Sequence, residues 1–468
     1  RLGRIILSAG AINHFEISEE KMGRMFGTDG VRGIANAGLS GELAFKLGQA
    51  SAEVLTGEVH RAKILIGMDT RISADMLEFA MVAGICSAGA DACTLGVIPT
   101  SAVAHLTRYY EADAGVVISA SHNSFEYNGI KIFNRDGYKL ADEIEDQIEH
   151  IVKNGSKKTL PTGLGVGRRV KLKNGIEEYI KFLSGTTAES LSGLKIALDC
   201  ANGAASMVAP EVFRRLGAEV ICFYNSPDGT NINDNCGSTH PENLSRLVSE
   251  MGADIGLAFD GDADRLIAID EFGRLINGDR VMAINAIDLK ERGLLKKDVL
   301  CATVMSNLGL ELGLKEHGIT VVKTDVGDRY VLEEMLKNGY SLGGEQSGHV
   351  IFLDHNTTGD GILTGIQLAS VLKRKQKSLS ELANVISILP QVLVNAKVSE
   401  DKKHCYTQDQ QIMEKISSLE GQMHGRGRVL IRPSGTEPLV RVMIEGEDRD
   451  YIEKQASDIA KLIETKLS

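Results

Sequence analysis

Three stretches of this chain repeat one pattern, in which a short apolar strand is followed by a helix and a second apolar strand. The repeats cover residues 63–97, 195–225 and 299–325. Apolar strands that alternate with helices at this spacing indicate βαβ units and largely parallel sheets. The pattern predicts three similar doubly wound α/β/α domains, although the three repeats share little sequence identity.

The last part of the chain, from about residue 386, follows a different order. It reads as a strand, a helix, a pair of strands and a terminal helix, which predicts a smaller α+β C-terminal domain. Polar stretches broken by Gly, and in the first case by Pro, lie at 153–165 and 270–279 and indicate linkers. We therefore expect four domains, over residues 22–165, 166–275, 276–385 and 386–468.

Composition limits the class of protein. A chain of 468 residues with 43% hydrophobic and 25% charged residues is typical of a multidomain globular protein. No apolar run approaches the ~20 residues that a membrane span needs, and a net charge of −11 argues against general nucleic-acid binding. Seven scattered cysteines without CxxC spacing indicate reduced thiols, so we expect a cytoplasmic protein.

Residues 1–21 look unlike the rest of the chain. Their apolar segment is short and is followed by charged residues rather than by a small-residue cleavage site, which disfavours the alternative of a signal peptide. We expect an N-terminal extension, either upstream sequence or a non-native addition, with the natural chain beginning at Met22 or Met25.

The stretch VISASHNSFEYNGIK, residues 117–131, carries an apolar strand into a Ser-His-Asn loop. Ligands of open α/β sheets bind where strands end, so Ser121 is a candidate nucleophile. Lys131 follows ten positions later on the returning strand and is a candidate general base. An ordinary Asx-type turn is the alternative interpretation.

A second loop places Asp260, Asp262 and Asp264 at alternate positions after an apolar strand. Three carboxylates on one tight loop suit a hard divalent cation, most plausibly Mg²⁺. A calcium EF-hand is disfavoured because Arg265 stands where that loop needs Gly and because the flanks are strand-like. A purely structural acidic turn is disfavoured because the three carboxylates would repel one another.

Two further loops have binding character. GGEQSGH, residues 343–349, offers donors and acceptors for sugar hydroxyls in Glu345 and Ser347, with His349 as a second candidate base. RPSGTEPLVR, residues 432–441, combines hydroxyls, free amides and guanidinium groups that suit a phosphate dianion. Its candidate phosphate-binding residues are Arg432, Ser434, Gly435, Thr436 and Arg441.

Together with FGTDGVRG, residues 26–33, which contains Arg32, these loops form five ordered motifs that resemble the α-D-phosphohexomutases. The resemblance covers essentially everything from Met22 to the C-terminus. Gln346 resembles the branch that acts on glucosamine phosphates, since the phosphomannomutase/phosphoglucomutase branch commonly carries Met there. Ser124 departs from the family, which usually has Pro after Ser-His-Asn, and we expect altered loop rigidity rather than altered chemistry.

The resemblance implies an isomerase that interconverts glucosamine 6-phosphate and glucosamine 1-phosphate for amino-sugar nucleotide and cell-wall precursor synthesis. Ser121 would be a phosphoserine and, with the three aspartates, a ligand of Mg²⁺, while a bisphosphorylated sugar would be the intermediate. Arg32 and Arg265 would stabilise charge during catalysis. The resemblance implies no membrane or nucleic-acid partner, and it allows a homodimer.

Three alternatives stay open from the sequence. The nearest is a phosphomannomutase or phosphoglucomutase of the same fold, for which Gln346 is the discriminating residue. The second is a catalytically silent sugar-phosphate sensor, which would not need a phosphorylatable serine beside a metal loop. The third is a metal-dependent phosphatase, in which water would release the phosphoryl group from Ser121.

Overall fold

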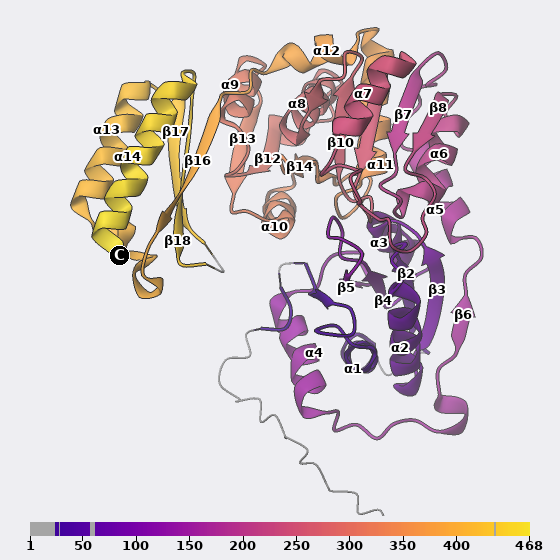
Figure 1. Cartoon of the computed structure of the whole chain (residues 1–468). Coiled ribbons are helices and arrows are strands. Elements are labelled where there is room, and N and C mark those ends of the chain that lie inside the picture. Colours follow the sequence, from indigo (N-terminus) through magenta and orange to yellow (C-terminus); the bar gives the residue numbers. More distant parts are fainter. Residues whose placement is uncertain (1–23, 28, 57–60, 435–436) are drawn as a thin grey trace, which may run out of the picture.

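The computed structural model describes residues 24–27, 29–56, 61–434 and 437–468. The predicted extension over residues 1–21 therefore lies outside the described residues, as do Gly435 and Thr436. Figure 1 shows a body built from three sheets with their helices and, beside it, a separate C-terminal module.

The first sheet has six strands in the order β1-β5-β4-β2-β3-β6. Its strands are β1 Val31–Ile34, β2 Lys63–Met68, β3 Asp91–Val97, β4 Ala114–Ile118, β5 Tyr127–Asn134 and β6 Arg169–Lys171. Alternate residues of β2 enter different cores: Ile64 and Ile66 pack with the helices on one face, and Leu65 packs on the other. This two-sided burial explains why the parallel strands read as continuous apolar runs.

Both faces of the first sheet are covered by helices. The helices of this part of the chain are α1 Gly41–Leu55, α2 Ala74–Ser87, α3 Thr100–Tyr109, α4 Asp142–Asn154 and α5 Gly175–Ser184. Buried residues of α1, α2 and α4 share one core, and those of α3 and α5 belong to the other.

The second sheet has the order β11-β10-β9-β7-β8, and the third has the order β13-β12-β14-β15. Their strands are β7 Lys195–Asp199, β8 Glu219–Phe223, β9 Ile255–Phe259, β10 Leu266–Asp270, β11 Leu275–Ile276, β12 Val299–Thr303, β13 Thr320–Thr324, β14 Leu342–Gly344 and β15 Val350–Phe352. The helices are α6 Ala205–Arg215, α7 Glu242–Met251, α8 Gly278–Glu291, α9 Leu308–Glu316, α10 Asp328–Asn338, α11 Gly361–Lys375 and α12 Leu379–Leu382.

The three sheets share one topology. In each, three adjacent parallel strands are followed by an antiparallel strand that returns through a hairpin, namely β4–β5, β9–β10 and β14–β15. This confirms the prediction of three similar α/β/α domains. The Ser121 loop, the aspartate loop and the Glu345 loop occupy these three equivalent hairpins.

One strand departs from the predicted division of the chain. The exposed strand β6 pairs in parallel with β3 of the first sheet, although the sequence analysis placed residues 166–275 in the second domain. The segment is polar and exposed, so it carries no periodic signal that would have assigned it to a sheet.

The three sheets share a common core. Residues 361–372 of α11 are buried, and Gly365 of this helix lies against Leu257 and Phe213 of the second domain. A single hydrophobic cluster runs from residues of the first sheet through the second and third. The hairpins that carry the candidate site are therefore fixed on one rigid body.

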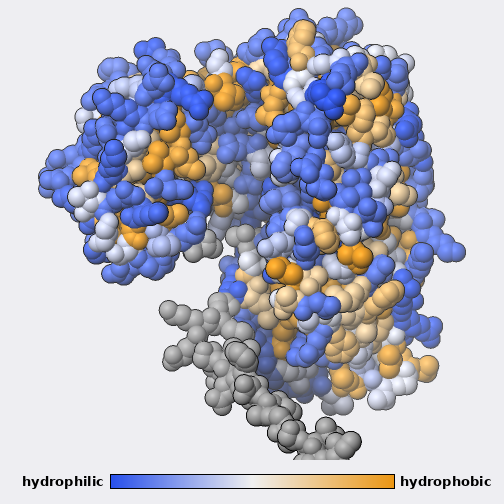
Figure 2. Space-filling view, viewed as in Figure 1, coloured by the Kyte–Doolittle hydropathy of each residue, from blue (hydrophilic) through white to orange (hydrophobic). Residues whose placement is uncertain are grey.

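The C-terminal module has its own core and an antiparallel sheet in the order β16-β18-β17. Its elements are β16 Gln391–Lys397, α13 Gln410–Met423, β17 Gly427–Pro433, β18 Leu439–Gly446 and α14 Arg449–Leu467. This confirms the predicted α+β module. Figure 2 shows an open hollow between the module and the domain of the first sheet.

No helix in the described part of the chain is both long and apolar enough to cross a membrane.

Candidate active site

The Ser121 loop and the aspartate loop meet directly. The Oγ of Ser121 donates a hydrogen bond to Oδ2 of Asp260 at 2.6 Å, and both residues are almost completely buried. The loops can approach this closely because Gly261 has no side chain: a Cβ there would lie 2.6 Å from the carbonyl oxygen of Ser121. Two of the sequence-predicted centres are thus one site.

Ser121 adopts a left-handed backbone conformation, with φ of 52°. This conformation is uncommon for a residue other than Gly and is held by the surrounding structure. The N–H of Ser121 donates to Oγ of Ser119 at 2.9 Å, and Ser119 in turn donates to the buried carboxylate of Asp69 at 2.6 Å. Ser121 therefore belongs to a loop and does not continue the strand.

His122 does not form a hydrolase dyad with Ser121. Its Nδ1 lies 3.4 Å from Oγ of Ser121, while the hydroxyl is directed to Asp260 at 2.6 Å. Ser121 lies in the loop after β4 rather than in a strand, so the alternation of side chains along a strand does not govern its position relative to His122.

The three aspartates could hold a divalent cation. One carboxylate oxygen from each of Asp260, Asp262 and Asp264 lies within 4.8 Å of the others, and all three residues are buried. Oδ1 of Asp262 and Oδ1 of Asp264 are buried without a hydrogen-bond partner. Unpaired buried carboxylate oxygens are costly unless a cation satisfies them, so the residues fit a metal ion.

Electrostatics agree with this interpretation. Burial raises the pKa of Asp260, and the neighbouring carboxylates of Asp264 and Asp262 raise it further. A divalent cation would remove this penalty. The loop joins strands β9 and β10 rather than two helices, which excludes the EF-hand alternative.

Lys131 extends from β5 into the same cluster. Its Nζ lies 2.8 Å from Oδ2 of Asp262, 3.0 Å from Oδ2 of Asp29 and 3.6 Å from Oδ2 of Asp264. Burial alone would lower the pKa of Lys131, but these carboxylates outweigh it and raise the pKa above its ordinary value. The ammonium group is therefore held protonated in this arrangement.

His349 closes the cluster from the third domain. Its Nδ1 lies 3.6 Å from Asp264 and its Nε2 lies 3.4 Å from Asp328. Burial lowers the pKa of His349, but Asp264 and its other acidic neighbours prevail and raise it to about 9. The N–H of Gly359 also donates to Nε2 at 3.1 Å, which suits the neutral ring. The buried Asp264 and the half-buried Asp328 outweigh one amide, so the protonated form dominates at neutral pH in this arrangement.

Glu345 and Ser347 lie in the β14–β15 hairpin. Burial raises the pKa of Glu345 above its ordinary value, and Oγ of Ser347 is buried without a partner. The loop is docked on the second domain, because the N–H of Leu266 donates to the carbonyl oxygen of Gly348 at 3.0 Å. Polar groups without partners are thus available beside the aspartate loop.

The two candidate arginines lie at the edges of the cluster. Arg265 follows the aspartate loop, and its N–H donates to Oδ1 of Asp260 at 3.2 Å while its Nε lies 3.8 Å from Asp264. Arg32 lies on β1 and pairs with Asp29.

The candidate phosphate-binding residues lie on the C-terminal module. Arg432 and Arg441 are directly opposite each other on β17 and β18, and Oγ of Ser434 is buried without a partner. Two like charges at opposed positions repel unless an anion lies between them. Within the described residues no hydrogen bond or ion pair joins these three side chains to the Ser121 loop. The structure thus keeps this group apart from the others.

The sequence analysis missed two residues that complete the charge cluster. Thr100, at the start of α3, donates from Oγ1 to Asp262 at 2.6 Å. Lys139 bridges Asp29 and Asp328, at 2.7 Å from each. Neither position has a motif that would mark it, because its partners are far away in the sequence.

Comparison with known sequences identifies the family. Sequence models of the phosphoglucomutase/phosphomannomutase family match four consecutive parts of the chain: α/β/α domain I over residues 23–159, domain II over 177–273, domain III over 277–387 and the C-terminal domain over 393–462. The chain belongs to this family.

Curated relatives indicate the branch of the family. A phosphoglucosamine mutase of Acetivibrio thermocellus is 59% identical over 448 residues, which is 95% of this chain and 100% of the relative. One of Clostridium acetobutylicum is 60% identical over 446 residues, again 95% of this chain and 100% of the relative. The chain therefore belongs to the phosphoglucosamine mutases, which are isomerases of the phosphohexomutase family.

Solved structures share the fold. A phosphoglucomutase/phosphomannomutase family protein from Burkholderia thailandensis superposes with a TM-score of 0.77 at 23% identity, covering 94% of this chain and 97% of that one. An Aspergillus fumigatus N-acetylphosphoglucosamine mutase, in complex with GlcNAc-6P and magnesium, gives 0.68 at 18% identity, covering 95% and 96%.

Proposed function

We propose that this chain interconverts glucosamine 6-phosphate and glucosamine 1-phosphate, with Ser121 as the residue that carries the phosphoryl group. The observation that supports this role is the 2.6 Å contact between Oγ of Ser121 and Asp260 inside the cluster of three carboxylates. A hydroxyl at this place can accept and return a phosphoryl group beside a cation.

The proposed reaction has two halves. A hydroxyl of the sugar phosphate attacks the phosphorus of phosphoserine 121, the bond from phosphorus to Oγ breaks, and a bisphosphorylated sugar forms. The sugar then turns round, Oγ of Ser121 attacks its other phosphate, and the monophosphate product leaves. A structure of an Aspergillus fumigatus N-acetylphosphoglucosamine mutase with glucose 1,6-bisphosphate supports such an intermediate by analogy.

We propose Mg²⁺ as the metal, held by Asp260, Asp262, Asp264 and an oxygen of phosphoserine 121. When bound, it would neutralise the charge that develops during transfer. It would also offset the negative charge of the aspartates and so lower the pKa values of Lys131 and His349. The unpaired oxygens of Asp262 and Asp264 and the oxygen chemistry of the site support a hard cation.

Glu345 and Ser347 are proposed to hold sugar hydroxyls in both orientations. Arg432, Ser434 and Arg441, with Gly435 and Thr436, are proposed to grip the phosphate that does not react. The opposed arginines support this role. Burial lowers the pKa of Arg432, and the charge of Arg441 opposite lowers it further, so a bound dianion would relieve the repulsion between them. Their place on a separate module would let the site close over the sugar.

Lys131 is proposed to exchange the proton of the attacking hydroxyl, with His349 as the second candidate. Both are protonated in this arrangement, so each would act first as an acid and as a base only after its carboxylate partners are neutralised. Arg265 and Arg32 are proposed to stabilise the charge of the transferring group.

The mutase is further proposed to act in the cytoplasm. Its seven cysteines, all within the described residues, are unpaired, which suits a reducing compartment. A homodimer stays a prediction that size-exclusion chromatography with light scattering can test.

A coupled assay tests the proposed function. Purified protein is supplied with glucosamine, glucose or mannose 6-phosphate and a trace of the matching bisphosphate, beside a Ser121→Ala variant. We expect a clear preference for glucosamine 6-phosphate and no turnover by Ser121→Ala, which should stay folded. A preference for glucose or mannose would favour the phosphomannomutase/phosphoglucomutase alternative, and release of inorganic phosphate would favour a phosphatase. Turnover by Ser121→Ala would exclude the phosphoserine.

A further inference from the structure

The Ser121 loop is held from behind by a buried guanidinium group. Arg71 follows β2, its side chain is fully buried, and its Nε pairs with Asp69 at 2.8 Å. The guanidinium donates to the carbonyl oxygens of Ser121 at 2.9 Å, Asn123 at 2.8 Å and Tyr127 at 2.9 Å, and it also donates to that of Ser124. A rigid fork of donors on four carbonyls fixes the course of this loop.

A second donor comes from another domain. Nδ2 of Asn233, in the loop between β8 and α7, donates to the carbonyl oxygen of Ser121 at 2.9 Å and to that of Asn123 at 3.0 Å. Each of these two carbonyls therefore receives one donor from Arg71 in the first domain and one from Asn233 in the second. A carbonyl oxygen has two lone pairs, so both acceptors are fully used.

These donors bear on the conformation of the nucleophile. Ser121 has φ of 52°, which is a strained conformation for a residue other than Gly and persists only where the surroundings enforce it. Rotation about the N–Cα bond of Ser121 to a negative φ would relieve the strain. Because Cβ and the carbonyl carbon turn together about that bond, the same rotation would move the carbonyl oxygen away from both donors and Oγ away from Asp260.

We propose that Asn233 is a positioning residue of the mutase reaction, which with Arg71 locks the strained backbone of Ser121 and so aims its oxygen at the metal-binding aspartates. The inference rests on the proposed role of Ser121. Asn233 belongs to the second domain, which also carries those aspartates. Its hydrogen bonds to the Ser121 loop of the first domain therefore fix the position of the nucleophile relative to the metal site.

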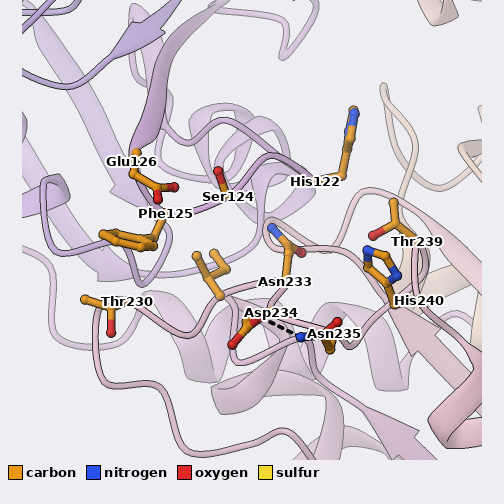
Figure 3. A pocket seen from close by; sticks show the side chains of 11 residues that line it. His122, Ser124, Phe125, Glu126, Thr230, Asn233, Asp234, Asn235, Thr239 and His240 are labelled. Atoms are coloured by element: carbon orange, nitrogen blue, oxygen red, sulfur yellow. Dashed lines mark hydrogen bonds between the residues drawn. The ribbon is translucent and has the colours of Figure 1, made fainter.

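The loop that contains Asn233 also contains a second asparagine, Asn235, which serves as a control. Asn233 and Asn235 both adopt left-handed backbone conformations, with φ of 59° and 51°. Both line a cavity of about 380 Å³ beside the Ser121 loop. Figure 3 shows Asn233 directed toward that loop, whereas Asn235 turns to Asp234, to which its Nδ2 donates at 2.8 Å.

The test compares Asn233→Ala and Asn233→Asp with Asn235→Ala in the full-length protein. All three remove an asparagine from a left-handed position of one loop, but only the first two remove donors from the Ser121 loop. Steady-state kinetics with glucosamine 6-phosphate give kcat and KM, and intact mass spectrometry follows the rate at which glucosamine 1,6-bisphosphate phosphorylates Ser121. Melting temperatures are measured for every variant.

Both Asn233 variants should lose kcat by about 10- to 100-fold with little change in KM, because a misplaced nucleophile slows transfer without weakening binding. Phosphorylation of Ser121 should slow by the same factor, and Asn235→Ala should keep the wild-type kcat. Wild-type kcat in both Asn233 variants would overturn the proposal while leaving the function of Ser121 intact. An equal loss in Asn235→Ala would also overturn it, because loop strain would then be the cause. Turnover by Ser121→Ala would instead remove its premise.

Discussion

The junction between the third domain and the C-terminal module depends on one buried ion pair. Arg428 on β17 and Glu445 on β18 lie directly opposite each other, with Nε of Arg428 2.7 Å from Oε2 of Glu445. Glu445 is fully buried and also accepts a hydrogen bond from the N–H of Leu308, at the start of α9, at 2.9 Å. Arg428 reaches the turn before the same helix by donating to the carbonyl oxygen of Ser306 at 2.6 Å.

Replacing Arg428 with Met should therefore loosen the module. The substitution leaves a buried carboxylate without its cation, which costs about 3–5 kcal/mol. The protein can avoid most of that cost by exposing Glu445 to water, which separates the module from α9. Loss of the bond from Leu308 to a charged acceptor corresponds to about 2 kcal/mol. At 1.4 kcal/mol for each factor of ten, the amide of Leu308 should exchange its hydrogen roughly 30-fold faster.

Hydrogen–deuterium exchange with mass spectrometry over residues 304–310 measures this opening, and kinetics give its effect on the substrate. KM for glucosamine 6-phosphate should rise, because the proposed phosphate-binding residues lie on the loosened module. Arg426→Met is the matched control: its guanidinium is 67% exposed and lies 3.7 Å from Glu447 at the end of the same hairpin. It should change exchange little, since exposed pairs contribute ~0–1 kcal/mol. Unchanged exchange at Leu308 in Arg428→Met would refute the reasoning.

Two further predictions concern metal and pH. Excess chelator should abolish turnover and Mg²⁺ should restore it, and Asp262→Asn should weaken both activity and the response to Mg²⁺; full activity in chelator would contradict the metal assignment. Burial raises the pKa of Asp279, at the start of α8, to about 6, above the ~3.9 of an unfolded chain. The native state then binds this proton more tightly than the unfolded state, so the ionised group destabilises the fold above about pH 6, by up to roughly 3 kcal/mol. Asp279→Asn should gain stability relative to the wild type as pH rises from about 4 to 7 in thermal unfolding, and a constant difference would contradict the burial argument.

The sequence predicted the repeated units and the loops that carry chemistry, because both leave local signals. The apolar runs of β2, β7 and β12 report burial on both faces of a sheet, and the Ser121, Asp260 and Glu345 loops have short motifs. Contacts between distant residues leave no such signal. Thr100, Lys139, Arg71 and Asn233 act through partners in other parts of the chain, so only the folded structure brings them to the site.

The exposed strand β6 was misplaced for the opposite reason. All three of its residues are exposed, and a strand that buries nothing has no hydrophobic period to read. The backbone conformation of Ser121 could not be predicted from local sequence either. Its left-handed conformation directs the hydroxyl to Asp260. A Ser-His-Asn tip suggests a turn, but the sign of φ depends on donors that lie far away in the sequence.

The shared topology explains how one site can be assembled from three domains. In each sheet the hairpin that follows the third parallel strand extends beyond the carboxyl edge of the parallel strands, where ligands of such sheets bind. The strands that flank each hairpin are largely buried, so each loop is held by a rigid frame and can be placed to a fraction of an ångström. The proposed nucleophile, metal ligands and sugar-binding groups then come from three separate frames that share one core, while the proposed phosphate-binding group lies on a fourth that does not. In this proposal, chemistry that needs fixed distances takes place on the rigid part, and the module joined through Arg428 and Glu445 opens and closes.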